Sequence, residues 1–155
     1  MTTELFPPIE SIIPHRGTML LLDAVCACSD ESLTAQASVR ADAWYADGAG
    51  AMPAWIGIEL MAQAIAAHVG LLSMREGKAA RPGVLLGTRR YTAMRPAFAS
   101  GALLRVSVNE LLRSAEGHGA YGCTIEQHGE LCAEATVKVY QPHDFQTFIE
   151  ENSRP

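Results

Sequence analysis

One apolar segment, "AMPAWIGIELMAQAIAAHVGLLSM" at residues 51–74, limits the possible folds of this chain more than any other. A helix that is apolar on nearly every face must lie inside a protein core or inside a bilayer. Glu59 lies within the run, and an uncompensated charge at mid-bilayer costs at least about 2.5 kcal/mol. We therefore expect a buried helix over residues 53–75 and no membrane span. Pro53 would be its first residue, where a missing N–H costs nothing.

The segments around this helix show the two-residue alternation that is typical of half-buried strands. Alternate positions are apolar in "LCAEATVKVY", residues 131–140, and in "LLRVSVNELL", residues 103–112. The polar turns "AEGHGA" and "EQHGEL" separate these runs, which favours an antiparallel meander. Shorter strand candidates are residues 19–28, 33–40 and 83–93. The expected order is two strands, one long helix and three or four further strands, an α+β fold in a single domain over residues 1–155.

Composition and charge exclude several protein classes. The 155 residues are 48% hydrophobic and 19% charged, which suits one globular domain with a sizeable core and excludes a disordered chain. A net charge of -5 with no basic block is unlike a nucleic-acid-binding protein. The first residues lack a basic segment followed by an apolar run, so we expect a cytoplasmic protein. The spacing of Cys26, Cys28, Cys123 and Cys132 matches no metal-binding pair, so we expect free thiols and no metal site.

Helical spacing places Glu59 on one face with Trp55 and Gln63, and His68 on the opposite face. Burial disfavours the ionised carboxylate, so a buried Glu59 would stay protonated near neutral pH and could act as a general acid. The alternative is a glutamate that only makes structural hydrogen bonds, to a strand or to a dimer partner. The helical pattern leaves both interpretations open.

Four motifs resemble those of the hot-dog-fold 3-hydroxyacyl-acyl-carrier-protein dehydratases. They are "IPHRGTMLLLDAV", "MPAWIGIELMAQA", "RPGVLLGTRRYTAMRPAFASGALLRVSV" and "HGELCAEATVKVY", and the resemblance extends from about residue 9 to residue 141. It implies a hot-dog fold, in which a curled antiparallel sheet wraps around one long central helix. The altered entry to the helix resembles more closely the dehydratase-like branch that occurs in arylpolyene-type pigment clusters.

The resemblance also implies a mechanism. In these dehydratases a histidine takes the C2 proton of a 3-hydroxyacyl thioester, and the helix acid, here Glu59, protonates the departing 3-hydroxyl to leave a trans-2-enoyl thioester. Backbone N–H groups at the helix start hold the thioester oxygen, and Ala54 matches the family glycine that provides one of them. Trp55, Gln63 and Tyr45 are expected to contact the substrate. No metal or organic cofactor is expected.

The chain departs from the family pattern at the catalytic histidine. Tyr45 stands at that position, and a phenol with a pKa near 10 is a poor base at neutral pH. Three possibilities stay open: His15, which lies in a family motif, supplies the base; a hot-dog partner in a heterodimer supplies it; or dehydratase activity is lost. His68, His118 and His128 are expected to pack or to face solvent.

Basic residues gather in residues 75–95, which hold half of the 12 Lys and Arg and include Arg89 and Arg90. Acyl carrier proteins are acidic, so these two arginines are candidates for carrier docking, although a solvated edge strand explains them equally well. The favoured function is a dehydratase of carrier-bound acyl chains in fatty acid or polyene-type synthesis. The alternatives are a hot-dog acyl-thioesterase, with Glu59 as base or nucleophile, and a non-catalytic subunit that completes a partner dehydratase. A homodimer and a heterodimer are both compatible with the sequence.

Overall fold

The computed structural model describes residues 5–77 and 84–141. Within these ranges the helical elements are α1 (Ile9–Ile12), the 3-10 turns η1 (Gly17–Met19) and η2 (Ala54–Ile56), and α2 (Gly57–Arg75). The strands are β1 (Ala24–Cys28), β2 (Ser32–Ser38), β3 (Met52–Pro53), β4 (Val84–Ala93), β5 (Ala97–Phe98), β6 (Leu103–Arg113), β7 (His118–Gln127) and β8 (Glu130–Tyr140).

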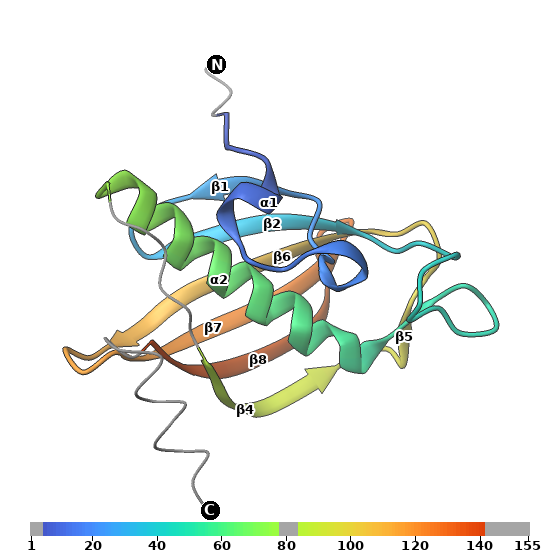
Figure 1. Cartoon of the computed structure of the whole chain (residues 1–155). Coiled ribbons are helices and arrows are strands. Elements are labelled where there is room, and N and C mark those ends of the chain that lie inside the picture. Colours follow the sequence, from blue (N-terminus) through green and yellow to red (C-terminus); the bar gives the residue numbers. More distant parts are fainter. Residues whose placement is uncertain (1–4, 78–83, 142–155) are drawn as a thin grey trace, which may run out of the picture.

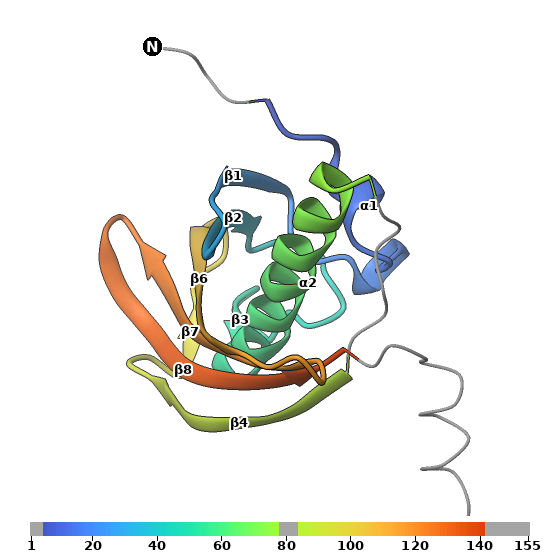
Figure 2. The ribbon, with the colours of Figure 1, turned by 90° about the vertical axis from the view of Figure 1, so that its left-hand side faces the viewer.

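Six of these strands form one antiparallel sheet in the order β1-β2-β6-β7-β8-β4. The sheet curls around α2, which lies across its concave face (Figures 1 and 2). The remaining two strands, β3 and β5, form a small ladder beside the start of α2. The hot-dog arrangement of a curled antiparallel sheet around one long central helix is therefore confirmed.

The apolar character of α2 is explained by its place in the core. Leu60, Met61, Ala64 and Ala67 are fully buried, and the inward side chains of the sheet cover them. The helix is long and apolar enough to cross a membrane, but 61% of its most apolar window is buried inside this protein. Its hydrophobicity thus serves a helix that is enclosed by protein.

The helix start differs from the prediction by one residue. Pro53 lies before η2 as its extended cap residue, with φ -54° and ψ 141°, and not at the first helical position. Pro53 still needs no intrahelical partner, because a cap residue makes no intrahelical N–H bond. The chain then tightens into a 3-10 turn before the α-helix begins at Gly57.

Two strand predictions need correction. Of the predicted strand 19–28 only Ala24–Cys28 pairs in the sheet, because the preceding N–H groups of Leu21 and Leu22 point to the Gln63 side chain instead. In β8 a register shift inserts one extra residue, so Cys132 is buried beside Ala133 while Leu131 is exposed. The alternation is correct from Ala133 onward, and no disulfide joins any of the four cysteines, all of which lie in the described part of the chain.

Candidate active site

Glu59 lies in the first turn of α2, close to a histidine from a distant part of the chain. Its Oε1 atom is 3.6 Å from His15 Nε2, within ion-pair range but too long for a hydrogen bond. The Glu59 side chain is 36% exposed and that of His15 is 26% exposed. Glu59 is thus less buried than the sequence pattern predicts.

Gln63 holds this pair in place from one turn further along the helix. Its Nε2 donates to Glu59 Oε1 at 3.0 Å and to the Met19 carbonyl oxygen at 2.6 Å. Its Oε1 accepts the N–H groups of Leu21, at 3.0 Å, and Leu22, at 3.4 Å. Gln63 therefore fixes the loop after His15 against the helix. Since both its amide hydrogens and its oxygen are engaged within the chain, nothing here supports the predicted substrate contact.

The other ring nitrogen of His15 has an unusual environment. Nδ1 is buried and has no hydrogen-bond partner among the residues that the structure describes. If Nε2 is to act as a base, the neutral ring must carry its proton on Nδ1, where a buried donor without an acceptor costs about 1–3 kcal/mol. The chain by itself therefore brings an imidazole to Glu59 but provides no acceptor that would fix its basic tautomer.

Tyr45, at the position of the family's histidine, is a structural residue in this fold. Its side chain is 8% exposed, and its hydroxyl accepts the Arg40 N–H at 3.0 Å and lies 3.4 Å from the Ser38 carbonyl oxygen. Both hydrogen bonds tie the loop after β2 to the sheet. The hydroxyl is therefore engaged with backbone, which leaves it unsuited to act as a base and lends no support to a substrate contact.

The helix start presents a limited set of backbone donors. The Ala54 N–H, expected to bind the thioester oxygen, donates to the Pro96 carbonyl oxygen at 3.0 Å. The next N–H group, of Trp55, lies in η2 and has no intrahelical acceptor, whereas the Ile56 N–H faces the Pro53 carbonyl three residues back, as the bonding of a 3-10 turn requires. In this structure the Trp55 N–H, and not that of Ala54, is the amide available to an oxyanion at the positive end of the helix.

Aromatic and sulfur-containing side chains surround the acid–histidine pair. Trp55 is 65% exposed, and Met19 and Trp44 are also exposed. Trp44 Nε1 donates to the Thr18 carbonyl oxygen at 2.7 Å, so it lies beside the same loop that Gln63 fixes. Exposed large apolar side chains of this kind are ones that a partner or an acyl chain can cover. Trp55 is available for the expected substrate contact.

No motif or periodicity in the sequence pointed to a role for Tyr91. This residue of β4 donates a hydrogen bond to the Ala54 carbonyl oxygen in η2, the turn that precedes the first turn of α2 with Glu59. Burial raises the pKa of Tyr91 to about 12.

The neighbouring Arg90 is exposed, as docking would require, while Lys78 and Arg81 of the predicted basic cluster lie outside the described residues.

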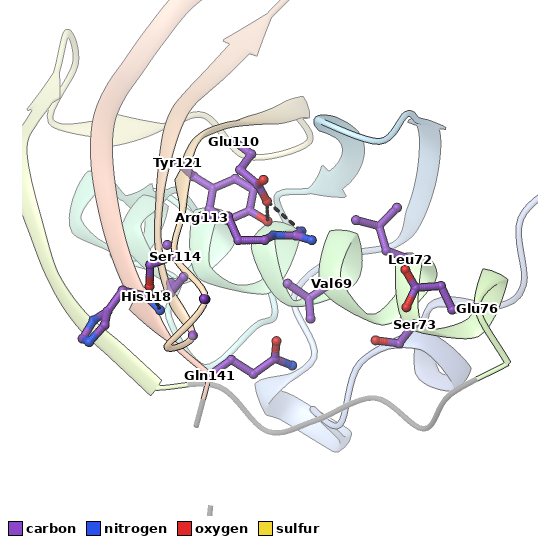
Figure 3. Close-up of a pocket in the computed structure, with 14 residues that line it drawn as sticks. Val69, Leu72, Ser73, Glu76, Glu110, Arg113, Ser114, His118, Tyr121 and Gln141 are labelled. Carbon is purple, nitrogen blue, oxygen red and sulfur yellow. Dashed lines mark hydrogen bonds and ion pairs between the residues drawn. The ribbon is translucent and has the colours of Figure 1, made fainter. Parts of the chain in front are cut away.

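A polar pocket of about 350 Å³ lies near the other end of α2 (Figure 3). Side chains from α2, β6, β7 and β8 line it, among them Ser73, Glu110, Arg113 and His118. The Arg113 guanidinium donates to Glu110 Oε2 at 2.8 Å. The pocket contains neither Glu59 nor His15, and its most prominent charges are already paired with each other. It is therefore a weaker candidate for the chemistry than the helix start.

His68 lies behind this pocket and is fully buried. Its Nε2 lies 3.0 Å from the Ser29 carbonyl oxygen, and its Nδ1 lies 2.9 Å from the Tyr121 hydroxyl. Burial lowers the pKa of His68 below its usual range, so the ring is neutral and Nε2 carries the proton. The prediction that His68 packs on the face opposite Glu59 is confirmed.

Known proteins resemble this chain in sequence and in fold. The family model of ApeP-like proteins, described as ApeP dehydratase, matches residues 7–150. A chain of the solved dehydratase heterocomplex ApeI:P from Xenorhabdus doucetiae is 29% identical, with a TM-score of 0.90 over 97% of this chain and 100% of that chain. No curated protein sequence matches this chain significantly.

More distant solved structures share the fold. The phenylacetic acid degradation protein PaaI from Thermus thermophilus is 23% identical, with a TM-score of 0.60 over 79% of this chain and 94% of that chain. A hypothetical thioesterase with coenzyme A from Streptococcus pneumoniae is 16% identical, with a TM-score of 0.58 over 76% and 86%. At these identities the likeness concerns the fold alone.

Proposed function

Since this chain belongs to the ApeP-like dehydratase family, we propose that it dehydrates 3-hydroxyacyl chains held as thioesters on an acyl carrier protein. The products are trans-2-enoyl chains of the kind needed for polyene-type synthesis. The observation that carries the proposal is the approach of His15 Nε2 to Glu59 Oε1 at the start of the central helix. This approach supports a base and an acid that act on one substrate, and no group of metal ligands occurs among the residues described.

The proposed reaction requires His15 in its neutral form and Glu59 in its protonated form. Neutral His15 accepts the C2 proton at Nε2, and protonated Glu59 gives its proton to the 3-hydroxyl. The C3–O bond breaks, the C2–C3 double bond forms, and water leaves. Afterwards an imidazolium faces a carboxylate across 3.6 Å, and transfer of the proton from His15 to Glu59 restores the starting state. The Trp55 N–H at the start of the helix stabilises the negative charge that develops on the thioester oxygen.

We further propose that the working form includes a second hot-dog subunit. The ApeI:P structure is a heterocomplex, and this chain matches one of its chains over nearly the full length. β4 ends the sheet, so its outer edge offers unpaired backbone groups to a partner strand. Tyr91 of the same strand reaches the helix start, which brings that edge close to Glu59.

A partner-supplied base is the second candidate arrangement. It is favoured by the buried His15 Nδ1, which has no acceptor in the described part of the chain and leaves the basic tautomer of His15 unsupported. In this arrangement Glu59 remains the acid, and a histidine of the partner takes the C2 proton. The role of His15 is then to orient the Glu59 carboxyl.

The test is turnover of a 3-hydroxyacyl thioester by the purified chain, alone and with a histidine-bearing hot-dog partner. Formation of the enoyl product is followed by its ultraviolet absorbance. Unaided turnover supports His15 as the base, whereas turnover only in the mixture supports the partner. A complex that hydrolyses the thioester and forms no enoyl product would refute the dehydratase and leave the thioesterase.

A further inference from the structure

We propose that Tyr91 is a positioning residue, which holds η2 at the start of the central helix so that the Trp55 N–H can receive the thioester oxygen. The inference rests on the proposed dehydratase function and adds a residue to it. Tyr91 comes from the edge strand β4, and its hydroxyl donates to the Ala54 carbonyl oxygen. This contact links the sheet edge directly to the turn that carries the available Trp55 amide.

A bulge in β4 turns this tyrosine toward the helix. Arg89 pairs with Thr136 and Thr92 pairs with Glu134, so β4 contains one more residue than β8 between these two pairs. Such an extra residue reverses the side-chain alternation of a strand. Thr88 pairs with buried Val137, so Thr88 lies on the core-facing side of the sheet. Without the extra residue, Arg90 would also point toward the core and Tyr91 would point away from it.

The bulge is accompanied by an uncommon backbone conformation at Arg90. Its φ is +52°, in the left-handed region that non-glycine residues rarely adopt. A residue held in this region costs of order 1–3 kcal/mol and persists only where surrounding contacts enforce it. The inward placement of Tyr91 and its hydrogen bond to the helix are the contacts that accompany it here.

Gly57, on the helix side of this contact, leaves space for the Tyr91 hydroxyl. A Cβ atom at Gly57 would overlap the Tyr91 hydroxyl oxygen, and it would lie 3.1 Å from Tyr91 Cζ and 3.0 Å from Ile125 Cδ1. Gly57 is therefore the residue that lets the hydroxyl reach the Ala54 carbonyl. Burial raises the pKa of Tyr91 to about 12, so the hydroxyl remains a donor throughout the neutral range.

The experiment compares Tyr91→Phe and Gly57→Ala, singly and together, in the chain assembled with its hot-dog partner. Tyr91→Phe should lower kcat roughly 10- to 100-fold, because small displacements of positioning groups have effects of this size, and should leave KM within about twofold. Gly57→Ala should displace the same hydroxyl and lower kcat similarly. The double variant should be no slower than either single variant, since both changes break one contact.

Tyr121→Phe is the matched control, because it removes a buried tyrosine hydroxyl far from the helix start, beside His68. Its kcat should stay within about twofold of wild type. Amide hydrogen exchange at Gly57 is a readout that needs no activity: its N–H donates to the Ala54 and Trp55 carbonyls, so exchange should quicken in Tyr91→Phe and not in Tyr121→Phe.

Wild-type kcat in Tyr91→Phe, unchanged Gly57 exchange, or multiplicative losses in the double variant would each overturn the positioning role. These results are separable from a failure of the proposed function. That failure would appear as full turnover in Glu59→Gln, and Gly57 exchange would still decide whether Tyr91 holds the helix start.

Discussion

His15 Nε2 and Glu59 Oε1 face each other across 3.6 Å, although they come from the N-terminal loop and from the central helix. Gln63 is the residue that makes this possible, because it bonds the Glu59 carboxyl with one amide hydrogen and the Met19 carbonyl with the other. The chain therefore assembles an acid and an imidazole at the same end of the helix without the histidine that dehydratases of this type carry at the position of Tyr45.

Replacing the acid should remove the chemistry and keep the fold. Glu59→Gln preserves the shape of the side chain and an oxygen that Gln63 can bond, so thermal stability should be nearly unchanged. Dehydration of a 3-hydroxyacyl thioester should fall roughly 10²–10⁴-fold, as is typical of a lost general acid. Glu116→Gln, in an exposed turn, is the control. Full turnover by Glu59→Gln would exclude the assigned role.

Replacing the imidazole should separate the two proposed bases. If His15 is the base, the homodimer is active and His15→Ala abolishes its turnover, while Tyr45→Phe costs about 1 kcal/mol of unfolding free energy and little activity. If a partner supplies the base, the homodimer is nearly inert and the mixed complex is active. An active homodimer that carries His15→Ala would contradict the first assignment.

Removing the Gln63 side-chain amide should lower both the stability of the fold and the activity of the site. Gln63→Leu leaves the buried Leu21 N–H without an acceptor, at about 1–3 kcal/mol, and also removes the donor to the part-buried Met19 carbonyl. Denaturant unfolding measures the loss, and turnover should fall because the His15 loop is no longer held. Gln36→Leu, at a half-buried position of β2, is the matched control. Equal stability of the two variants would argue against the role of Gln63 in holding the His15 loop.

Buried His68 should make the protein less stable in mild acid. Its pKa is lowered in the folded state, chiefly by desolvation, so the unfolded chain binds the proton more readily. Its contribution to stability is complete above the unfolded pKa of about 6.5 and decreases as the pH falls below it, by at most about 1.4 kcal/mol per pH unit. His68→Gln should flatten this dependence in denaturant titrations between pH 7 and 5. His128→Asn, in the β7–β8 turn, should not; a curve for His68→Gln that parallels wild type would contradict the prediction.

Charge reversal on the edge strand tests carrier docking. Arg89→Glu with Arg90→Glu should weaken turnover of carrier-bound substrates and spare small thioester analogues, because only the carrier protein is steered by long-range charge. The loss should shrink as salt is raised. Equal losses for both kinds of substrate would indicate a local structural effect and count against docking.

The sequence by itself determined the architecture. An apolar helix with a single internal acid, flanked by alternating strands, can only bury its surface by lying against a sheet, and the structure confirms α2 inside the curled sheet. The alternation in β6 likewise identified Leu104, Val106 and Val108 as core residues. These features follow from local periodicity, which is a property of neighbouring residues.

Only the tertiary structure decided how the site is assembled. The approach of His15 to Glu59 depends on the side-chain hydrogen bonds of Gln63. The Tyr45 hydroxyl is engaged because the fold brings backbone groups of Arg40 and Ser38 next to it. Tyr91 reaches the helix only because one extra residue in β4 reverses the alternation. Such contacts join positions far apart in the chain, and a bulge or a register shift carries no periodic signal, so residue spacing could not predict them.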